Sequence, residues 1–334
     1  MKKIAVIAPA RPHFGNTLTQ LPFLVALRKA YGDCEITVWS KFESSRILIV
    51  NQGANRVVNY QDMSVFSFLR AFNREHYDIV FNLRPGCEKS HVLIGLLSNA
   101  KKKYAYSIKK YNRYLYDQHL LLPKGQIYIA NVYLRLLERV TQQRYDVSVI
   151  QDVTGHISCC KDTLVLLPGG GAGEFKRWPV ERFVEVMHLV TRTPAHGLKR
   201  VVVILGRDEQ AYHSYFFHSV NQVPVEVVDS PGVERLIEIA QSTKLAIAND
   251  CGPAHIFQMN RCPIIMIWGY KRADHPPFHQ MPEWSLPTEH SWNIVPDDEY
   301  QSIQSISAQR VASLAVAQLN HLNGHMGRAD LPAA

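Results

Sequence analysis

The sequence predicts an α/β protein with two parallel β-sheets, each covered by helices on both faces. Short runs of Val, Ile and Leu alternate with amphipathic stretches along the chain, which is typical of parallel strands buried on both faces. The alternation stops at the polar residues 142–162 and then starts again. With 334 residues, the chain is long enough for two domains. We therefore expect two doubly wound domains in tandem, joined by a linker at 142–162.

The first half of the chain contains apolar runs that we interpret as strands, at residues 3–9, 35–39, 57–60, 78–83 and 103–107. Apolar residues recur at helical spacing between and after them. This spacing predicts helices at residues 18–31, 42–51, 65–74, 89–99 and 127–141. The alternation predicts an N-terminal domain at residues 1–150.

The second half repeats the same order of elements. Strands are predicted at residues 163–167, 200–205, 225–228, 245–248 and 264–268. Helices are predicted at residues 179–192, 208–219, 233–241, 253–259 and 308–322. We place a C-terminal domain at residues 160–305 and a C-terminal helical segment at 306–323, and we expect the tail at 324–334 to fray.

The composition and the start of the chain indicate a cytoplasmic protein. No stretch approaches the roughly 20 apolar residues of a membrane span. The apolar run after Lys3 is too short for a signal peptide, and Pro9 interrupts it. The six cysteines form no Cys-x-x-Cys pair, so zinc ribbons and thioredoxin-like redox sites are not expected.

A basic run indicates an anionic partner, as does the net charge of +8. It begins at Lys101, Lys102 and Lys103, continues through Lys109 and Lys110 to Arg113, and contains no acid. Such a run suits a phosphorylated substrate or an anionic membrane surface, and a solvated basic face is the alternative. No nucleic-acid-binding motif accompanies it, so nucleic acid is not expected as a partner.

A glycine-rich loop follows the strand at 163–167. It contains Gly169, Gly170, Gly171 and Gly173, and Lys176 comes shortly after. Exposed backbone amides in such a loop can bind phosphates, and a lysine adds a positive charge beside them. The loop fits neither the P-loop nor the dinucleotide-binding pattern. A flexible turn without a ligand is the alternative.

A second candidate site follows the strand at 245–248, where Asp250, Cys251, Gly252 and His255 precede or begin a helix. Amides at the start of a helix attract a diphosphate, and Asp250 could hold sugar hydroxyls. The alternative is a capping Asp250 and a packed His255. After the strand at 200–205, Glu209 is a candidate for binding ribose hydroxyls, with helix capping as the alternative.

The first predicted strand leads into a turn that carries three further candidates. We expect His13 and Asn16 to face a cleft between the two domains, and Arg11 could contact an anionic acceptor substrate. An ordinary connection between strand and helix is the alternative.

Metal-binding patterns are missing from the sequence. There is no Asp-x-Asp and no His-Glu-x-x-His, and two prolines separate His275 from His279 in the helix-breaking order His-Pro-Pro-Phe-His. We therefore expect no metal ion and no cofactor, with Lys176 offsetting the charge of a leaving diphosphate.

Taken together, the motifs resemble one family. Lys176-Arg-Trp-Pro matches a Lys-x-Trp-Pro segment, Asp250-Cys-Gly-Pro-Ala-His matches Asp-Thr/Ser-Gly-x-x-His, and Gly15 to Pro22 is similar to Gly-Asp-x-x-x-x-x-Pro. These are segments of the ADP-heptose:lipopolysaccharide heptosyltransferases of glycosyltransferase family 9, which the chain resembles over residues 1–320. The resemblance implies a GT-B fold of two facing Rossmann-like domains, with the acceptor in the first and the donor in the second.

The resemblance also implies the reaction, an inverting displacement at the anomeric carbon of heptose. Lys176 would stabilise the diphosphate and Asp250 would bind the sugar. Gly252 and His255 would lie at the phosphates, and Glu209 at the adenosine. The acceptor would be the anionic Kdo–lipid A inner core, which implies peripheral contact with the inner face of the cytoplasmic membrane.

Two positions depart from the family pattern. Asn16 stands where the family has its catalytic Asp, and an amide cannot accept the proton of the acceptor hydroxyl. His13 is the nearest titratable replacement. Cys251 replaces a Thr or Ser. Two alternatives follow for the function: a non-catalytic nucleotide-sugar-binding relative and a nucleotide-sugar epimerase.

Overall fold

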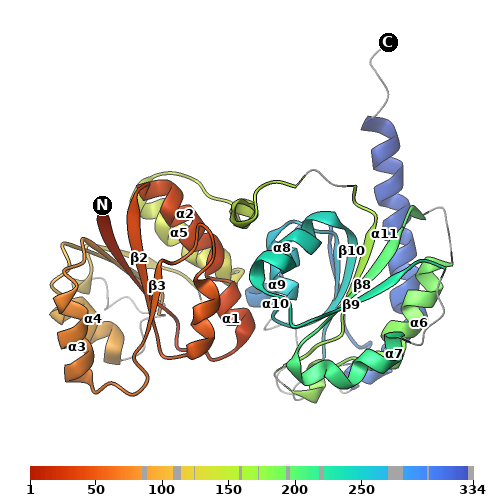
Figure 1. The fold of residues 1–334 in the computed structure, drawn as a ribbon, viewed down its shortest axis with the longest axis horizontal. Helices are drawn as coiled ribbons and strands as arrows, with labels where there is room; N and C mark the ends of the chain where they lie inside the picture. The colour runs from red at the N-terminus through yellow and green to blue at the C-terminus, as the bar shows by residue number, and fades with distance from the viewer. Residues whose placement is uncertain are drawn as a thin grey trace, which may run out of the picture. The chain divides into compact units, whose positions relative to one another are not determined.

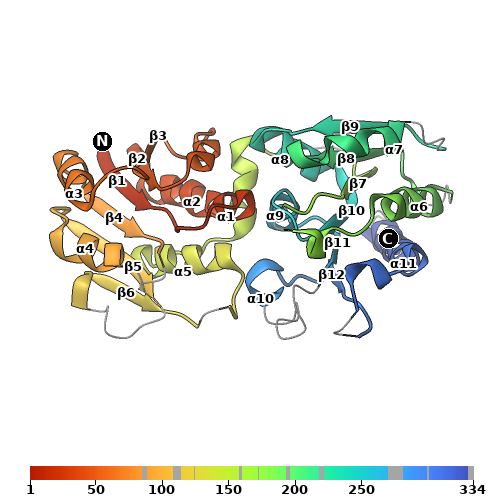
Figure 2. The same cartoon turned by 90° about the horizontal axis from the view of Figure 1, so that it is seen from below.

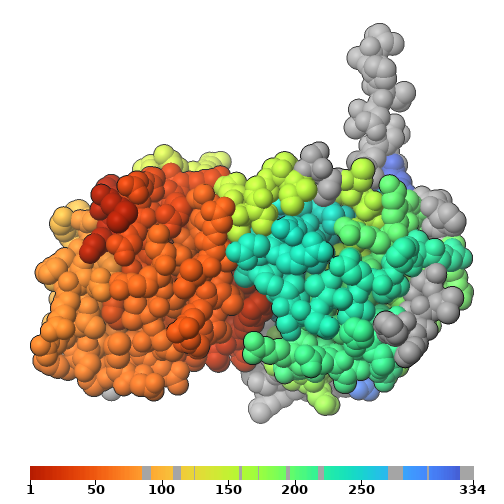
Figure 3. Space-filling model, viewed as in Figure 1, coloured from red at the N-terminus to blue at the C-terminus, as the bar shows by residue number. Residues whose placement is uncertain are grey.

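The chain folds into two compact units, Met1–His156 and Ile157–Ala334, drawn as a ribbon in Figure 1 and with filled atoms in Figure 3. The structure is a computed structural model. It describes residues 1–84, 89–107, 114–123, 125–157, 160–171, 173–192, 196–217, 222–269, 281–298 and 301–329.

The first unit is built around a six-stranded parallel sheet in the order β3-β2-β1-β4-β5-β6. Ile4 of the central strand lies opposite Ile36 on one side and Ile79 on the other, and all three side chains are buried. Buried apolar residues on strands are what make a parallel sheet stable between two layers of helices. The strands are β1 (Lys2–Ile7), β2 (Cys34–Ser40), β3 (Arg56–Asn59), β4 (Ile79–Asn82), β5 (Lys102–Ser107) and β6 (Gln118–Leu121).

Helices cover both faces of this sheet. Helices α2 and α5 lie on one face and α3 and α4 on the other (Figures 1 and 2). An aromatic cluster fills the layer under α3, where Trp39 stacks edge-on to Phe68 and donates a hydrogen bond of 2.8 Å to the Tyr77 hydroxyl. The helical elements are α1 (Phe14–Leu18), α2 (Leu21–Tyr31), η1 (Glu43–Leu48), α3 (Val65–Arg74), α4 (Lys89–Leu97), α5 (Ile129–Thr141) and η3 (Val147–Val153).

The second unit has a six-stranded parallel sheet in the order β12-β11-β10-β7-β8-β9. Its central strands are buried along their whole length. The strands are β7 (Thr163–Leu167), β8 (Arg200–Leu205), β9 (Val225–Asp229), β10 (Thr243–Asn249), β11 (Ile264–Ile267) and β12 (Ser291–Ile294).

Helices α6 and α11 lie on one face of the second sheet and α8 and α9 on the other (Figures 1 and 2). Among the described residues, no helix has the length and apolar character needed to cross a membrane. The helical elements are η4 (Glu174–Lys176), α6 (Val180–Thr191), η6 (Arg207–Tyr212), α7 (His213–Phe217), α8 (Val233–Ser242), α9 (Ala254–Met259), α10 (Met281–Trp284), η8 (Ile303–Ser305) and α11 (Ala308–Ala329).

The two sheets have the same topology. Counted from the first strand of each unit, both run third, second, first, fourth, fifth, sixth. The connections after parallel strands all leave from the same edge, so each unit gathers its loops at the carboxyl edge of its sheet. The predicted α/β class with two doubly wound sheets is confirmed.

Every predicted strand is present within about two residues, but two edge strands were missed. Strand β6 is short and half-polar, and only one of the four residues of β12 is buried. Both lack the continuous apolar run that identified the central strands. They are strands because β5 and β11 offer them unpaired backbone groups, which a local pattern cannot show.

Several predicted helices have different forms in the structure. The helix predicted at 18–31 is α2, which begins at Leu21 with Pro22 in its first turn. A separate short helix, α1, precedes it and ends at Leu18, and the chain turns at Thr19 and Gln20 between the two. The stretch 42–51 is the 3-10 helix η1, and 208–219 is η6 followed by α7. The expected linker contains η3, and α11 continues to Ala329 beyond the predicted end at 322.

Candidate active site

Lys176 and Asp250 meet at the carboxyl edge of the second sheet. Lys176 ends η4, Asp250 follows β10, and the two residues are 74 positions apart in the chain. The ammonium group of Lys176 donates to Oδ2 of Asp250. The side chains are only 19% and 8% exposed, so water screens this ion pair less than a surface pair. The pairing brings together two of the predicted donor-binding residues.

Gly170 is held tightly from both sides. Its N–H donates to Oε1 of Glu209 at 3.4 Å, and its carbonyl oxygen accepts a 3.0 Å hydrogen bond from Nε of Arg177. A Cβ at this position would lie 2.8 Å from Cγ of Arg177 and 2.9 Å from the carbonyl oxygen of Lys176. Glycine is therefore required for the loop to approach the Lys176 segment. Gly171 is exposed, and a Cβ there would meet open space.

Glu209 lies in η6 with its carboxylate buried against backbone amides. Oε2 accepts a 3.0 Å hydrogen bond from the Gly206 N–H, and Oε1 accepts the bond from Gly170. The carboxylate thus joins the loop after β7 to the loop after β8. The capping interpretation describes this contact, and a contact of Glu209 with adenosine stays a prediction.

Cys251 and His255 are both buried and electrically neutral near pH 7. Burial is the main cause that raises the pKa of the Cys251 thiol to about 12, and the nearby Asp250 and Glu209 contribute in the same direction. Burial lowers the pKa of His255 to about 4, and its ring lies 5.8 Å from that of Trp284. The backbone N–H of His255 donates to the carbonyl oxygen of Gly252 at 3.1 Å. Neither side chain would bring a positive charge to a phosphate.

Asn249, the last residue of β10, was not identified as a candidate from the sequence. It is fully buried. Its Nδ2 donates to the Pro168 carbonyl oxygen at 2.8 Å, and its Oδ1 accepts from the backbone N–H of Trp178 at 3.4 Å. Its place at a strand end, directly before Asp250, was the available signal. Gly269 was also missed: a Cβ there would lie 1.8 Å from the carbonyl oxygen of Phe175.

The acceptor-side candidates of the first unit lie at the start of α1. Asn16 is 9% exposed, and its carbonyl oxygen accepts hydrogen bonds from Oγ1 of Thr19 and Nε2 of Gln20. His13 is exposed and precedes the helix in an extended conformation, and Arg11 is half-buried. The structure therefore places His13 and Asn16 on one short segment after β1.

Arg84, in the first unit, was not identified as a notable residue from the sequence. It lies two residues beyond β4 and is fully buried. Its Nε donates to the carbonyl oxygen of Ala8 at 3.1 Å, its Nη2 donates to the Tyr60 hydroxyl, and its guanidinium lies 5.6 Å from the Tyr60 ring centroid. This arginine anchors the chain just before the segment that carries His13 and Asn16.

The lysines predicted to bind the acceptor lie at the start of β5, at the amino edge of the first sheet. Asn16 follows β1 and so lies towards the opposite edge. Lys101 pairs with Asp78 at 2.7 Å, Lys102 with Asp117 at 3.6 Å, and Nζ of Lys103 donates to the Gly95 carbonyl oxygen at 2.5 Å. The chain segment contains no acid, but the fold supplies two. Lys109, Lys110 and Arg113 lie outside the described residues.

Within the described parts of the chain, no group of three or more His, Cys, Asp or Glu side chains is arranged to hold a metal ion. His275 and His279, the histidines considered from the sequence, lie outside those parts.

Comparison with solved structures shows the fold. E. coli heptosyltransferase WaaC with ADP is 15% identical, with a TM-score of 0.68, over 95% of this chain and 99% of that one. A glycosyltransferase family 9 protein from Veillonella parvula is 20% identical, with a TM-score of 0.65 and coverages of 96% and 98%. E. coli ADP-heptose lps heptosyltransferase II is 16% identical, with a TM-score of 0.62, over 96% of this chain and 99% of that one. The architecture is that of GT-B glycosyltransferases.

A family model gives the assignment from sequence. No curated protein matches the chain. The model of glycosyltransferase family 9 (heptosyltransferase) matches residues 65–308, which is more than half of the chain and includes the Lys176 and Asp250 segments. The chain is a glycosyltransferase and belongs to glycosyltransferase family 9.

Proposed function

We propose that this protein transfers heptose from ADP-heptose to the lipopolysaccharide inner core or a related cell-envelope glycan, with inversion and without a metal ion. The observation that supports this most strongly is the shielded Lys176–Asp250 pair beside the glycine-rich loop. One solved E. coli WaaC structure, with a TM-score of 0.69, contains ADP-2-deoxy-2-fluoro heptose. A donor of the same class fits the chemistry of these residues.

On the donor side, we assign the diphosphate to Lys176 and the sugar hydroxyls to Asp250. Negative charge grows on the diphosphate as its bond to the anomeric carbon breaks, and a preorganised cation stabilises that charge without reorganising water. Asp250 holds the ammonium group in place until the donor arrives. Gly170, Gly171, Gly252 and Cys251 complete the donor side, and the neutral His255 acts through hydrogen bonding.

On the acceptor side, an acceptor hydroxyl oxygen attacks the anomeric carbon as ADP leaves with the electron pair of the broken bond. The hydroxyl proton needs a base. The Asn16 amide cannot take it but can hold the acceptor by a hydrogen bond. We assign the proton to His13, because it is titratable, exposed and on the same segment as Asn16.

We propose an anionic glycolipid of the Kdo–lipid A type as the acceptor, with Arg11 as its first contact. The net charge of +8 favours such a partner and peripheral contact with an anionic membrane surface. Lys101, Lys102 and Lys103 already have partners, so they would contribute to the general field more than to a specific contact.

A mass-spectrometric transfer assay tests the proposal. ADP-heptose and inner-core acceptors are incubated with the protein, with EDTA in one arm. We expect a heptose-mass increment that persists in EDTA and falls about 10²–10³-fold in Lys176→Ala. Lys199→Ala is the matched control, because Lys199 is exposed and pairs with Asp162 at 3.7 Å. It should leave the rate unchanged.

Other results would lead to the alternatives. Binding of ADP-heptose without transfer to any acceptor would indicate a non-catalytic relative, a reading motivated by Asn16. Isomerisation of the sugar in the absence of acceptor would indicate an epimerase. Loss of transfer in EDTA would contradict metal independence.

A second experiment tests the base. His13→Ala should lower kcat about 10²-fold or more, the usual contribution of a general base. Adding Asn16→Asp to that variant should restore turnover, because a carboxylate then stands at the position where the family has it. Equal rates in His13→Ala and the unchanged protein would remove His13 from the reaction.

A further inference from the structure

We propose that Asn249 is a positioning residue that fixes both ends of the glycine-rich loop and so holds Lys176 at the donor. The positioning role rests on the contacts of Asn249, whereas its effect on turnover rests on the proposed function. The loop leaves β7 at Pro168 and returns at Trp178, just before α6. Gly170, Gly171 and Lys176 all lie between these two residues.

One carboxamide joins the two ends of this loop. The amide nitrogen of Asn249 donates to the Pro168 carbonyl oxygen at 2.8 Å, and its oxygen accepts from the Trp178 N–H at 3.4 Å. The partners are 81 and 71 positions away in the chain. Asn249 and Trp178 are almost completely buried, so water cannot replace these bonds without penetrating the core. The side chain therefore closes the loop at its base.

The contacts inside the loop depend on this closure. The Arg177 side chain donates to the Gly170 carbonyl oxygen, and the Phe175 backbone passes directly over Gly269. Lys176 lies between Phe175 and Arg177, and it reaches Asp250, the neighbour of Asn249 in sequence. A shift of the loop base would move Lys176 relative to Asp250. Misplacing a catalytic group by about 1 Å can slow a reaction about 10²-fold.

The first unit contains a matched residue with a different task. Asn82 ends β4, which has the same place in its sheet as β10, and it is also fully buried. Its Nδ2 donates to the Tyr116 hydroxyl at 2.7 Å, and its Oδ1 accepts the Arg84 N–H at 3.1 Å. Removal of Asn82 should disturb a strand end to a similar degree without touching the loop that carries Lys176.

The test compares Asn249→Ala, Asn249→Asp and Asn82→Ala by three measurements. Calorimetry with ADP measures nucleotide affinity, the transfer assay measures kcat and KM, and hydrogen exchange measures protection of residues 173–178. Asn249→Ala should raise the Kd of ADP about tenfold, the cost of one unmade buried hydrogen bond. It should also lower kcat about 10²-fold. Asn82→Ala should leave the Kd of ADP within about twofold.

The Asp variant separates the two ends of the loop. A carboxylate can still accept the Trp178 N–H but cannot donate to Pro168. We expect the Trp178 amide to stay protected in Asn249→Asp and to exchange faster in Asn249→Ala, while kcat falls in both. A purely structural role would lower thermal stability in all three variants alike and leave ADP affinity and kcat of the folded molecules unchanged. That pattern would overturn the proposal.

Failure of the donor assignment has a different signature. If the unchanged protein neither binds ADP nor transfers heptose, the proposed function is wrong, and the exchange of residues 173–178 still tests the positioning role. Unchanged protection of these residues in Asn249→Ala would overturn it.

Discussion

The two units stabilise the same point of the fold with different side chains. The difference distinguishes a purely structural contact from a contact beside the candidate site. In each unit a carbonyl group follows the first strand at the carboxyl edge of the sheet. In the first unit Arg84 donates to that carbonyl, at Ala8, and in the second Asn249 donates to it, at Pro168. Arg84, the cation that makes this contact in the first unit, is fully buried. In the second unit the neutral amide of Asn249 makes the equivalent contact, and the nearby cation, Lys176, is partly exposed.

A charged side chain that binds a ligand must therefore be partly shielded from water but still accessible to the ligand. Lys176 keeps 19% of its side chain exposed and has one acidic partner, whereas Arg84 is closed off by an aromatic ring and a carbonyl group. The same topology thus gives a fully buried arginine in one unit and a partly exposed lysine, the proposed donor-binding cation, in the other. Hydrogen exchange can follow the stability of the two units separately, and the predictions below use it to test this contrast.

The largest effect is expected at Gly269 of the second unit. A methyl group there would meet the Phe175 carbonyl oxygen at 1.8 Å and Cβ of Ile303 at 2.9 Å. Gly269→Ala should destabilise the second unit by more than about 3 kcal/mol, because the backbone must move to make room. Gly171→Ala is the control, since a Cβ there meets nothing. Equal protection of the second unit in both variants would show that the Phe175 segment is free to move.

The next effect is a pH dependence that belongs to His255 of the second unit. Burial lowers its pKa from 6.5 to about 4. Above pH 6.5 the ring is neutral in both states, and as pH falls towards 4 only the unfolded chain takes up the proton. Stability is therefore lost over this window, by about 3 kcal/mol at most.

Denaturant unfolding at a series of pH values measures this loss. His255→Gln should make the pH slope between 6.5 and 4 shallower by about one proton. His196, whose pKa burial also lowers, contributes in the same direction and remains in both proteins. The slopes are compared, so a constant cost of the substitution does not matter. Identical slopes would exclude His255 as the source.

A smaller effect is expected from Arg84 in the first unit. Arg84→Met keeps the volume but leaves the Ala8 carbonyl without the guanidinium donor. The cost should be about 2 kcal/mol, the penalty for an unmet buried acceptor. It should appear as faster exchange in the first unit while the Kd of ADP stays unchanged. A weaker affinity for ADP would mean that Arg84 also affects the donor site, which would contradict the contrast drawn between the two units.

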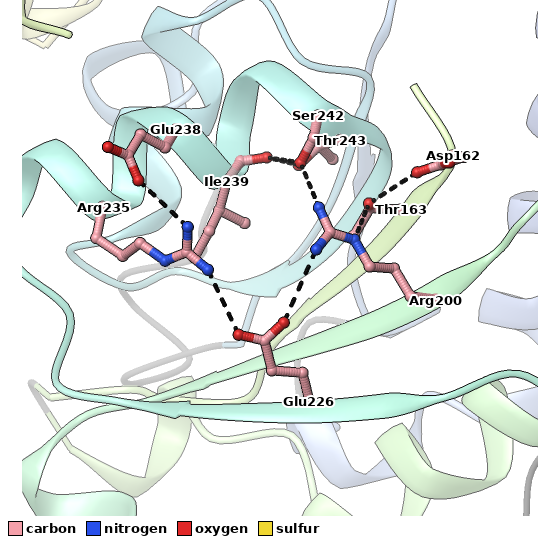
Figure 4. A network of polar contacts seen from close by, with 9 residues as sticks. All are labelled: Asp162, Thr163, Arg200, Glu226, Arg235, Glu238, Ile239, Ser242 and Thr243. Atoms are coloured by element: carbon pink, nitrogen blue, oxygen red, sulfur yellow. Dashed lines mark hydrogen bonds and ion pairs between the residues drawn. The ribbon is translucent and has the colours of Figure 1, made fainter. Parts of the chain in front are cut away.

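The smallest effect is expected at the amino edge of the second sheet, away from the candidate site. There Glu226 lies between Arg200 at 3.9 Å and Arg235 at 3.4 Å (Figure 4), with side chains 41% to 48% exposed. Glu226→Gln should cost less than about 1 kcal/mol and less still in high salt, because exposed ion pairs are weak and screened. Thermal unfolding at two salt concentrations measures this. A larger, salt-independent loss would show that the network belongs to the core.

Much of the fold and part of the site followed from local sequence. Continuous Val, Ile and Leu runs identified the central strands, since burial on both faces leaves a pattern within each strand. Strands β6 and β12 left no such pattern, because an edge strand takes its identity from its neighbour. Lys176 and Asp250 were identified because each lies in a short motif after a strand, and the structure joins them.

Other assignments depended on contacts between residues far apart in the chain. The lysines at 101–103 looked uncompensated in sequence, yet the fold brings Asp78 and Asp117 to two of them. Glu209 was a candidate for ribose, and its carboxylate accepts hydrogen bonds from Gly206 and Gly170. Asn249 gave no signal in the sequence beyond its place at a strand end, directly before Asp250.

The sequence by itself therefore determined the α/β class, the two-domain order, the central strands and the motif residues that assign the family. These depend on spacing along the chain, which burial and helix geometry translate directly into pattern. Only the tertiary structure decided which polar groups satisfy one another, because hydrogen bonds between residues 71 to 81 positions apart leave no local trace. For that reason only the fold showed that Arg84 is a buried anchor, that Asn249 joins the two ends of the glycine-rich loop, and that Lys176 stays partly exposed beside Asp250.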